Sequence, residues 1–88
     1  MVIYLDLKKV FGKNIKYYRF KNKFTQATLS EKAGISSTYL SEVERGQHSV
    51  DFDVIYSLAK SLGIEPYELF VKNKNIQLPR RIDMFKNK

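Results

Sequence analysis

Apolar side chains recur at helical spacing between residues 10 and 71, in five blocks separated by capping and turn residues. In the first block, four of them share one face of a helix: Val10, Phe11, Ile15 and Tyr18. Asp6 precedes the block as an N-cap, so we expect a first helix that runs to about Lys21. Tyr17 and Phe20 fall outside the apolar face, and we expect both to be exposed or to lie at an interface.

Two short helices are predicted next, joined by a tight turn. Thr25 is a favourable N-cap for a helix over residues 26–33, and Gly34 stands where a left-handed residue ends a helix. Ser36 then caps a helix over residues 37–44. Each helix has an inward apolar pair: Leu29 and Ala33, then Leu40 and Val43. Helices joined so closely cross at a steep angle, which leaves the second one free to enter a major groove.

Two further helices complete the pattern. Asp51 caps the fourth helix and Gly63 ends it, whereas Pro66 opens a short final helix over residues 66–71. The fourth helix is expected to bury one side: Phe52, Ile55, Leu58, Ala59 and Leu62. Because strands and helices do not alternate along the chain, the sequence predicts an all-α domain of five helices.

The C-terminal segment differs from the helical part in composition. Residues 72–88 are rich in Lys, Arg and Asn and are interrupted by Pro79. We therefore divide the chain into a helical domain over 1–71 and a basic tail over 72–88, flexible or part of a dimer interface. The alternative is a strand in the tail that pairs with the β-prone residues 2–4.

The charge balance and the absence of cysteine narrow the function classes. A net charge of +7 and an isoelectric point near 9.7 favour a polyanionic partner, either nucleic acid or an anionic membrane. The chain has no cysteine, which excludes disulfides and thiolate zinc sites. The longest apolar run, residues 1–5, is far below the roughly 20 residues of a bilayer span. Without such a span, a cytoplasmic protein is expected. We expect no membrane partner, because the apolar face of the basic first helix is already required by the core.

The paired helices resemble the helix-turn-helix of the Cro and phage-repressor family, the XRE-like group. The residues that carry the resemblance are Gln26, Leu29, Ser30, Ala33, Gly34, Leu40, Val43, Glu44 and Gly46. The resemblance extends from Phe11 to about Phe70 and implies a lambda-repressor-like DNA-binding domain with a double-stranded DNA operator as its partner. Residues 37–46 are especially similar to controller proteins of restriction-modification systems, which we keep beside phage repressors and antitoxins as possible roles.

The resemblance also implies structural roles for individual residues. The positions of Arg19 and Glu44 form an internal ion pair in the family, and the helical pattern turns both inward, where an unpaired charge is costly. The alternative is that Arg19 is another cation facing DNA. Ser30 stands where the family usually has alanine, and we expect its hydroxyl to bond to the Gln26 carbonyl oxygen.

In relatives, the second of the paired helices reaches base edges, and these positions hold Ser36, Ser37, Thr38, Ser41 and Glu42. Hydroxyl groups encode little base preference, whereas Glu42 is able to accept from the N4 amine of cytosine. The resemblance implies backbone phosphate contacts by Gln26, Tyr39, Arg45, Gln47 and Ser49. The alternative for Tyr39 is that it packs beside the preceding helix. The alternative for the whole polar face of the helix over residues 37–44 is that it is only a solvated surface. His48 is interpreted as an ordinary surface histidine.

One recognition helix reads only a few base pairs, so we expect a homodimer on two half-sites. Its contacts are expected from the last helix, which carries more apolar surface than it can bury alone: Tyr67, Leu69, Phe70 and Val71.

Two other function classes are alternatives to DNA binding. A protein-interaction module or antitoxin would use residues 76–85 as a binding segment that orders on contact. An enzyme such as a small nuclease is not expected, because the sequence has no carboxylate cluster for two metals and no nucleophile with a base. We therefore expect no cofactor and no metal.

Overall fold

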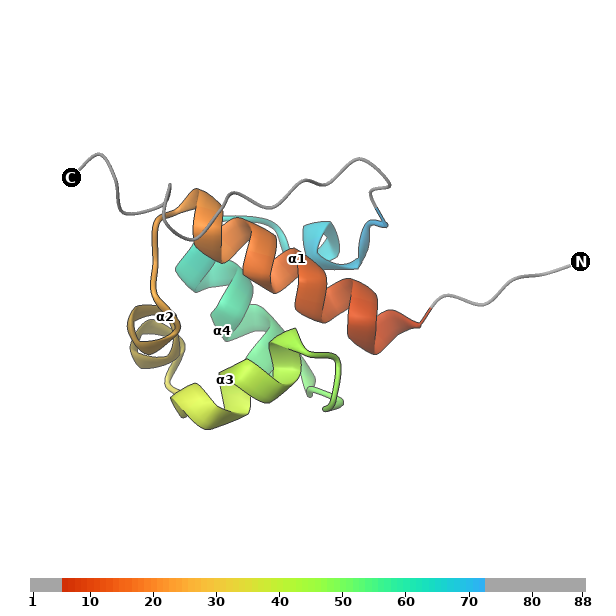
Figure 1. The fold of residues 1–88 in the computed structure, drawn as a ribbon. Helices are drawn as coiled ribbons and strands as arrows, with labels where there is room; N and C mark the ends of the chain where they lie inside the picture. Colours follow the sequence, from red (N-terminus) through yellow and green to blue (C-terminus); the bar gives the residue numbers. More distant parts are fainter. Residues whose placement is uncertain (1–5, 73–88) are drawn as a thin grey trace, which may run out of the picture.

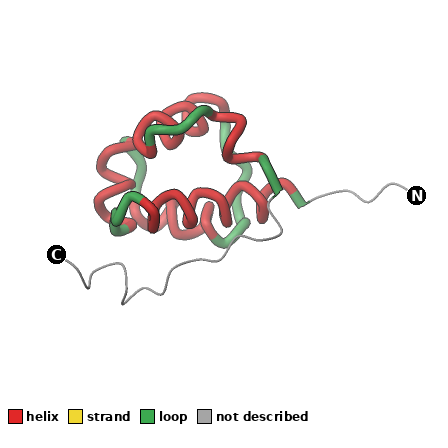
Figure 2. Tube along the Cα trace, turned by 90° about the horizontal axis from the view of Figure 1, so that it is seen from above, coloured by secondary structure: helices red, strands yellow, loops and turns green. Residues whose placement is uncertain are grey.

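The computed structural model describes residues 6–72, which form a bundle of helices (Figure 1). Its elements are α1 (Leu7–Lys21), α2 (Gln26–Ala33), α3 (Ser37–Glu44), α4 (Phe52–Leu62) and the 3-10 helix η1 (Pro66–Phe70). Within the described residues there are only helices and loops, as Figure 2 shows. The predicted all-α fold is thus confirmed, although its fifth element is a single 3-10 turn and not an α-helix. The strand pairing considered between residues 2–4 and the tail lies outside the described residues.

Side-chain caps set where the four α-helices begin. Asp6, Thr25, Ser36 and Asp51 each accept a hydrogen bond from the backbone N–H three residues later, at 2.9–3.2 Å. At the other ends, Gly34 and Gly63 adopt the left-handed conformation, with φ of 74° and 72°. The helix boundaries are therefore local features of the sequence, as predicted. None of the helices in residues 6–72 is long and apolar enough to cross a membrane.

A single core fills the space between the helices. Its most deeply buried side chains come from all five elements: Ile15, Leu29, Leu40, Val43, Leu58 and Leu69. Leu69 is fully buried, so its assignment to a dimer interface is wrong. The reason is that η1 inserts this side chain between α1 and α4 and leaves its neighbours outside.

A buried amide holds η1 against α1. Asn14 is only 3% exposed, and its Nδ2 donates to the carbonyl oxygens of Leu69 at 2.8 Å and Val71 at 3.0 Å. Nearby, burial and then the Glu68 carboxylate raise the pKa of the Tyr18 hydroxyl. The terminal 3-10 turn is thereby fixed to the first helix by polar contacts as well as by Leu69.

The burial of two aromatic residues, Phe52 and Phe20, differs from the prediction. Phe52 is 88% exposed and not part of the inward face of α4, because it occupies the first position of the helix, before the buried stripe begins. Phe20 is 8% exposed and not a surface residue. Its ring lies 4.8 Å from the Arg19 guanidinium carbon and 5.8 Å from the Lys16 ammonium.

Candidate nucleic-acid interface

The helices α2 and α3 meet across a short turn at one edge of the bundle (Figure 1). Gly34 reverses the chain in the left-handed conformation. The hydroxyls of Ser30 and Ser37 lie 2.9 Å apart and connect the two helices. Ser30 Oγ also donates to the carbonyl oxygen of Ala27 at 2.9 Å. The predicted bond to the Gln26 carbonyl is therefore wrong by one residue, because the hydroxyl is shared with α3.

The residues expected to read bases lie on α3 and at its N-cap. Three are exposed and two are half-buried: Ser36, Ser37 and Thr38, then Ser41 and Glu42. The hydroxyl of Ser36 accepts from the N–H of Tyr39, and that of Ser37 is bonded to Ser30, so both have partners inside the protein. Thr38 is exposed and, within residues 6–72, its hydroxyl has no hydrogen-bond partner. Within residues 6–72, the Thr38 hydroxyl is therefore free to contact another molecule, whereas the hydroxyls of Ser36 and Ser37 also stabilise the motif.

The loop after α3 places its polar side chains beside the same helix. Arg45, Gln47 and Ser49 are all exposed. The Arg45 guanidinium donates from Nη1 to the hydroxyl of Ser41 and from Nη2 to Oε1 of Gln47 at 3.3 Å. One cation is therefore held between the recognition helix and the loop, on the solvent side of both.

A second contact joins this loop to α3. His48 Nε2 and Glu42 Oε1 lie 2.8 Å apart, and the His48 ring lies 5.3 Å from the ring of Tyr39. Tyr39 is half-buried and packs against the core, in line with the packing alternative. Its contact with DNA stays a prediction.

Arg19, Glu44 and Gln26 form a buried network behind the motif. Arg19 donates from Nε to Glu44 Oε2 at 2.7 Å and from Nη2 to Oε1 at 3.0 Å, with side chains only 7% and 3% exposed. Gln26 Nε2 also donates to Glu44 Oε1, at 3.1 Å. The remaining guanidinium nitrogen, Nη1, donates to the carbonyl oxygen of Phe24 at 3.1 Å. The network joins α1, the start of α2 and the end of α3, and it engages the Gln26 amide that was expected to face a phosphate.

Gly12 is a residue that the sequence analysis did not single out. A Cβ added at this position would overlap the carbonyl oxygens of Val43 and Glu44, the latter at 2.7 Å. The signal was present in the sequence, because a glycine inside a helix needs a packing reason. His48 was also missed as a partner of Glu42, since a contact across a helix end follows no periodic spacing.

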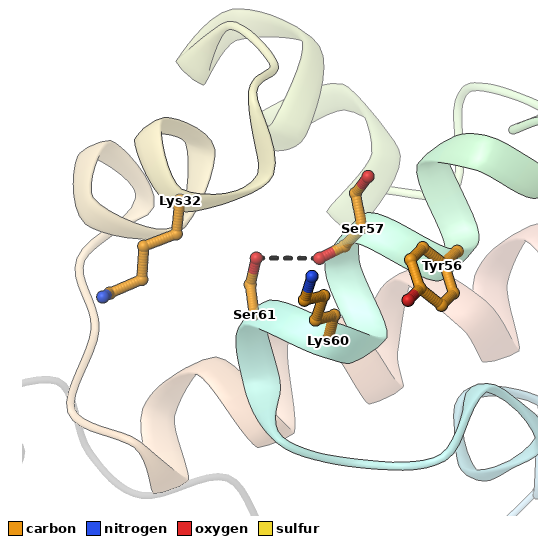
Figure 3. A pocket seen from close by; sticks show the side chains of 5 residues that line it. All are labelled: Lys32, Tyr56, Ser57, Lys60 and Ser61. Carbon is orange, nitrogen blue, oxygen red and sulfur yellow. Dashed lines mark hydrogen bonds between the residues drawn. The ribbon is translucent and has the colours of Figure 1, made fainter.

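A shallow hollow of about 470 Å³ lies between α2 and α4 (Figure 3). It is lined by Lys32, Tyr56, Ser57, Lys60 and Ser61, and Ser61 Oγ donates to the carbonyl oxygen of Ser57 at 2.7 Å. The lining contains ammonium and hydroxyl groups but no carboxylate. Among the residues that the structure describes, no three His, Asp or Glu side chains gather as metal ligands.

The profile of the helix-turn-helix family matches residues 15–69, most of the described chain. The chain belongs to this family. The control protein C.SmaI of Serratia marcescens is 30% identical over 71 residues, which cover 81% of this chain and 84% of the relative. The control protein C.BamHI of Bacillus amyloliquefaciens is 31% identical, with coverage of 73% and 80%.

A solved structure extends the likeness to three dimensions. The restriction-modification controller protein C.AhdI from Aeromonas hydrophila is 38% identical, with a TM-score of 0.70 and coverage of 72% of this chain and 96% of that chain. This helix-turn-helix chain is therefore a DNA-binding transcriptional regulator of the Cro/C1 type, and the paired helices α2 and α3 are its family motif.

Proposed function

We propose that the chain binds a specific double-stranded DNA operator as a homodimer, with α3 of each subunit in a major groove. The observation that carries the proposal is the placement of α3, whose polar outer side faces solvent while Leu40 and Val43 anchor its inner side in the core. A helix held in this way matches the shape of a major groove. The net charge of +7 adds attraction to the phosphates.

Base reading is assigned to the exposed edge of α3: Ser36, Ser37, Thr38, Ser41 and Glu42. Thr38 is the strongest candidate for contact with a thymine methyl, since its side chain is exposed. Glu42 is the candidate for the N4 amine of cytosine. Because Ser36 and Ser37 already bond within the motif, we expect smaller effects on base preference from these two residues.

Phosphate contact is assigned to residues at the start of α2, in the first turn of α3 and in the loop after α3: Gln26, Tyr39, Arg45, Gln47 and Ser49. Arg45 is the main contact, because its exposed guanidinium is steadied by Ser41 and Gln47. Gln26 has the weaker claim, since its amide already donates to Glu44. A phosphate at Gln26 would bind the free N–H groups at the start of α2 instead.

The homodimer interface is assigned to the surface of η1 and the residue after it. Tyr67 is 68% exposed, Val71 51% and Phe70 38%. Neighbouring exposed apolar side chains of this kind are typical of a protein–protein interface, whereas single ones are common on any surface. Phe70 lies against the Phe11 ring at 5.3 Å and lines a hollow of about 160 Å³ with Leu7. A second copy would cover these groups and set the spacing between two recognition helices.

Similarity to the two control proteins and to C.AhdI supports a controller role for this regulator. In that role the chain would act on transcription of restriction-modification genes. Binding of the purified chain to the DNA upstream of its own gene, compared with unrelated DNA of the same length, tests this role.

Selection from a library of randomised duplexes tests the central proposal. We expect the full chain to enrich two related half-sites about one helical turn apart, and to sediment on that duplex as a dimer. Enrichment of a single half-site, with one chain per duplex, would contradict the homodimer. No enrichment of any sequence would contradict specific binding.

A further inference from the structure

We propose that His48 is a positioning residue for base reading, which holds the carboxylate of Glu42 at the edge of the recognition helix. The inference rests on the proposed function and adds to it a residue that has no part in the assignments above.

The contact engages one carboxylate oxygen and leaves the other available. His48 Nε2 lies 2.8 Å from Glu42 Oε1, and within residues 6–72 the second oxygen, Oε2, has no hydrogen-bond partner. An ionised carboxylate only accepts hydrogen bonds, so the imidazole carries a proton on Nε2 in this contact. Both side chains are partly exposed, 43% for His48 and 35% for Glu42. Oε2 is thus the oxygen left to accept from a base amine.

The imidazole is itself supported by Tyr39. The two rings have centroids 5.3 Å apart and are tilted by 37°, and Tyr39 packs against the core below. Tyr39 and Glu42 are three residues apart on α3, which places them on the same side of the helix. His48 therefore contacts both residues from the following loop. A glutamate that is fixed before DNA arrives loses less side-chain entropy on binding.

A double-mutant cycle on the selected duplex tests whether His48 acts through Glu42. The base pair that Glu42 reads is found by comparing selections with the natural chain and with Glu42→Gln. We expect about tenfold discrimination at that pair in the natural chain and about twofold in His48→Gln. In the Glu42→Gln background, His48→Gln should have no further effect on discrimination. Glu31→Gln, a matched change at an exposed carboxylate of α2, should leave discrimination unchanged.

Equal base preferences for the natural chain and His48→Gln would overturn the inference and leave the proposed function intact. An effect of His48→Gln that is undiminished in the Glu42→Gln background would also overturn it, since His48 would then act on DNA directly. A natural chain that enriches no duplex would instead contradict the proposed function, and the inference with it.

Discussion

The absence of a side chain at Gly12 allows α1 to lie close to the end of α3. At Gly12 the backbone carbonyls of Val43 and Glu44 occupy the space that any Cβ would need. Neither oxygen belongs to a flexible side chain, so the overlap has no inexpensive relief. The close approach also brings Arg19 within reach of Glu44, and Gly12 therefore serves the geometry of the whole motif.

Replacing Gly12 with alanine should destabilise the domain by about 2 kcal/mol, because the added methyl group overpacks the crossing of α1 and α3. Urea unfolding followed by circular dichroism measures the change. Lys13→Ala is the matched control on the exposed side of α1 and should change stability by less than about 0.5 kcal/mol. Equal stabilities for the two variants would show that the helices separate there at no cost.

Arg45 is the residue at which phosphate contact is most directly measured. Arg45→Ala should weaken binding to all DNA sequences alike and reduce the slope of log K against log salt by about one per half-site. Arg45→Lys retains the charge and should retain most of the slope. Loss of preference at one base pair in Arg45→Ala, with the slope unchanged, would instead make Arg45 a base-reading residue.

At the scale of elements, the buried network of Arg19, Glu44 and Gln26 fixes the angle at which α3 leaves the core. Its three members come from α1, α3 and α2, and none of the contacts is local in sequence. Buried ion pairs add little net stability compared with apolar residues of similar volume, but loss of one partner is costly. We interpret the network as a device that orients the recognition helix.

Arg19→Ala should destabilise the domain by about 3 kcal/mol, because it leaves the carboxylate of Glu44 buried without its cation. Thermal unfolding measures the effect. The double variant Arg19→Met with Glu44→Leu removes both charges and should recover most of the stability. It should nevertheless bind the selected duplex more weakly, since the orientation of α3 is no longer fixed by hydrogen bonds. Full affinity in the stable double variant would refute an orienting role.

At the scale of the whole molecule, η1 contributes both to the core and to the exposed surface that we propose as the dimer interface. Leu69 completes the core, while Tyr67 and Phe70 on the same turn remain exposed. The buried side chain of Asn14 fixes this turn to α1, so a partner subunit would meet a rigid surface.

Exchanging Tyr67 and Val71 for serine should shift the chain from dimer to monomer and raise the dimer dissociation constant at least about tenfold, since buried tyrosines dominate many interfaces. Sedimentation velocity at micromolar concentration measures the state. Tyr56→Ser, at an exposed tyrosine of α4 that lines a different hollow, is the matched control. A dimer that survives the double change but dissociates in Tyr56→Ser would move the interface to α4.

The sequence alone determined the features that depend on neighbouring residues. The caps at Asp6, Thr25, Ser36 and Asp51 and the helix-ending glycines follow from local hydrogen bonds and backbone conformation, so the boundaries of the four α-helices were predictable. Most members of the inward stripes followed from helical spacing in the same way, although Phe52 did not. Together with the family resemblance, these features were enough to predict the fold and the position of the helix-turn-helix.

Only the tertiary structure decided the features that depend on how elements meet. Phe52 and Leu69 show this most clearly: both are large apolar residues in predicted helices, yet one is 88% exposed and the other is fully buried. The contact between His48 and Glu42 and the close approach at Gly12 likewise join segments that periodicity does not relate. The physical reason is that spacing fixes the direction of a side chain on its own helix, whereas its burial and its partners depend on which other helix lies opposite.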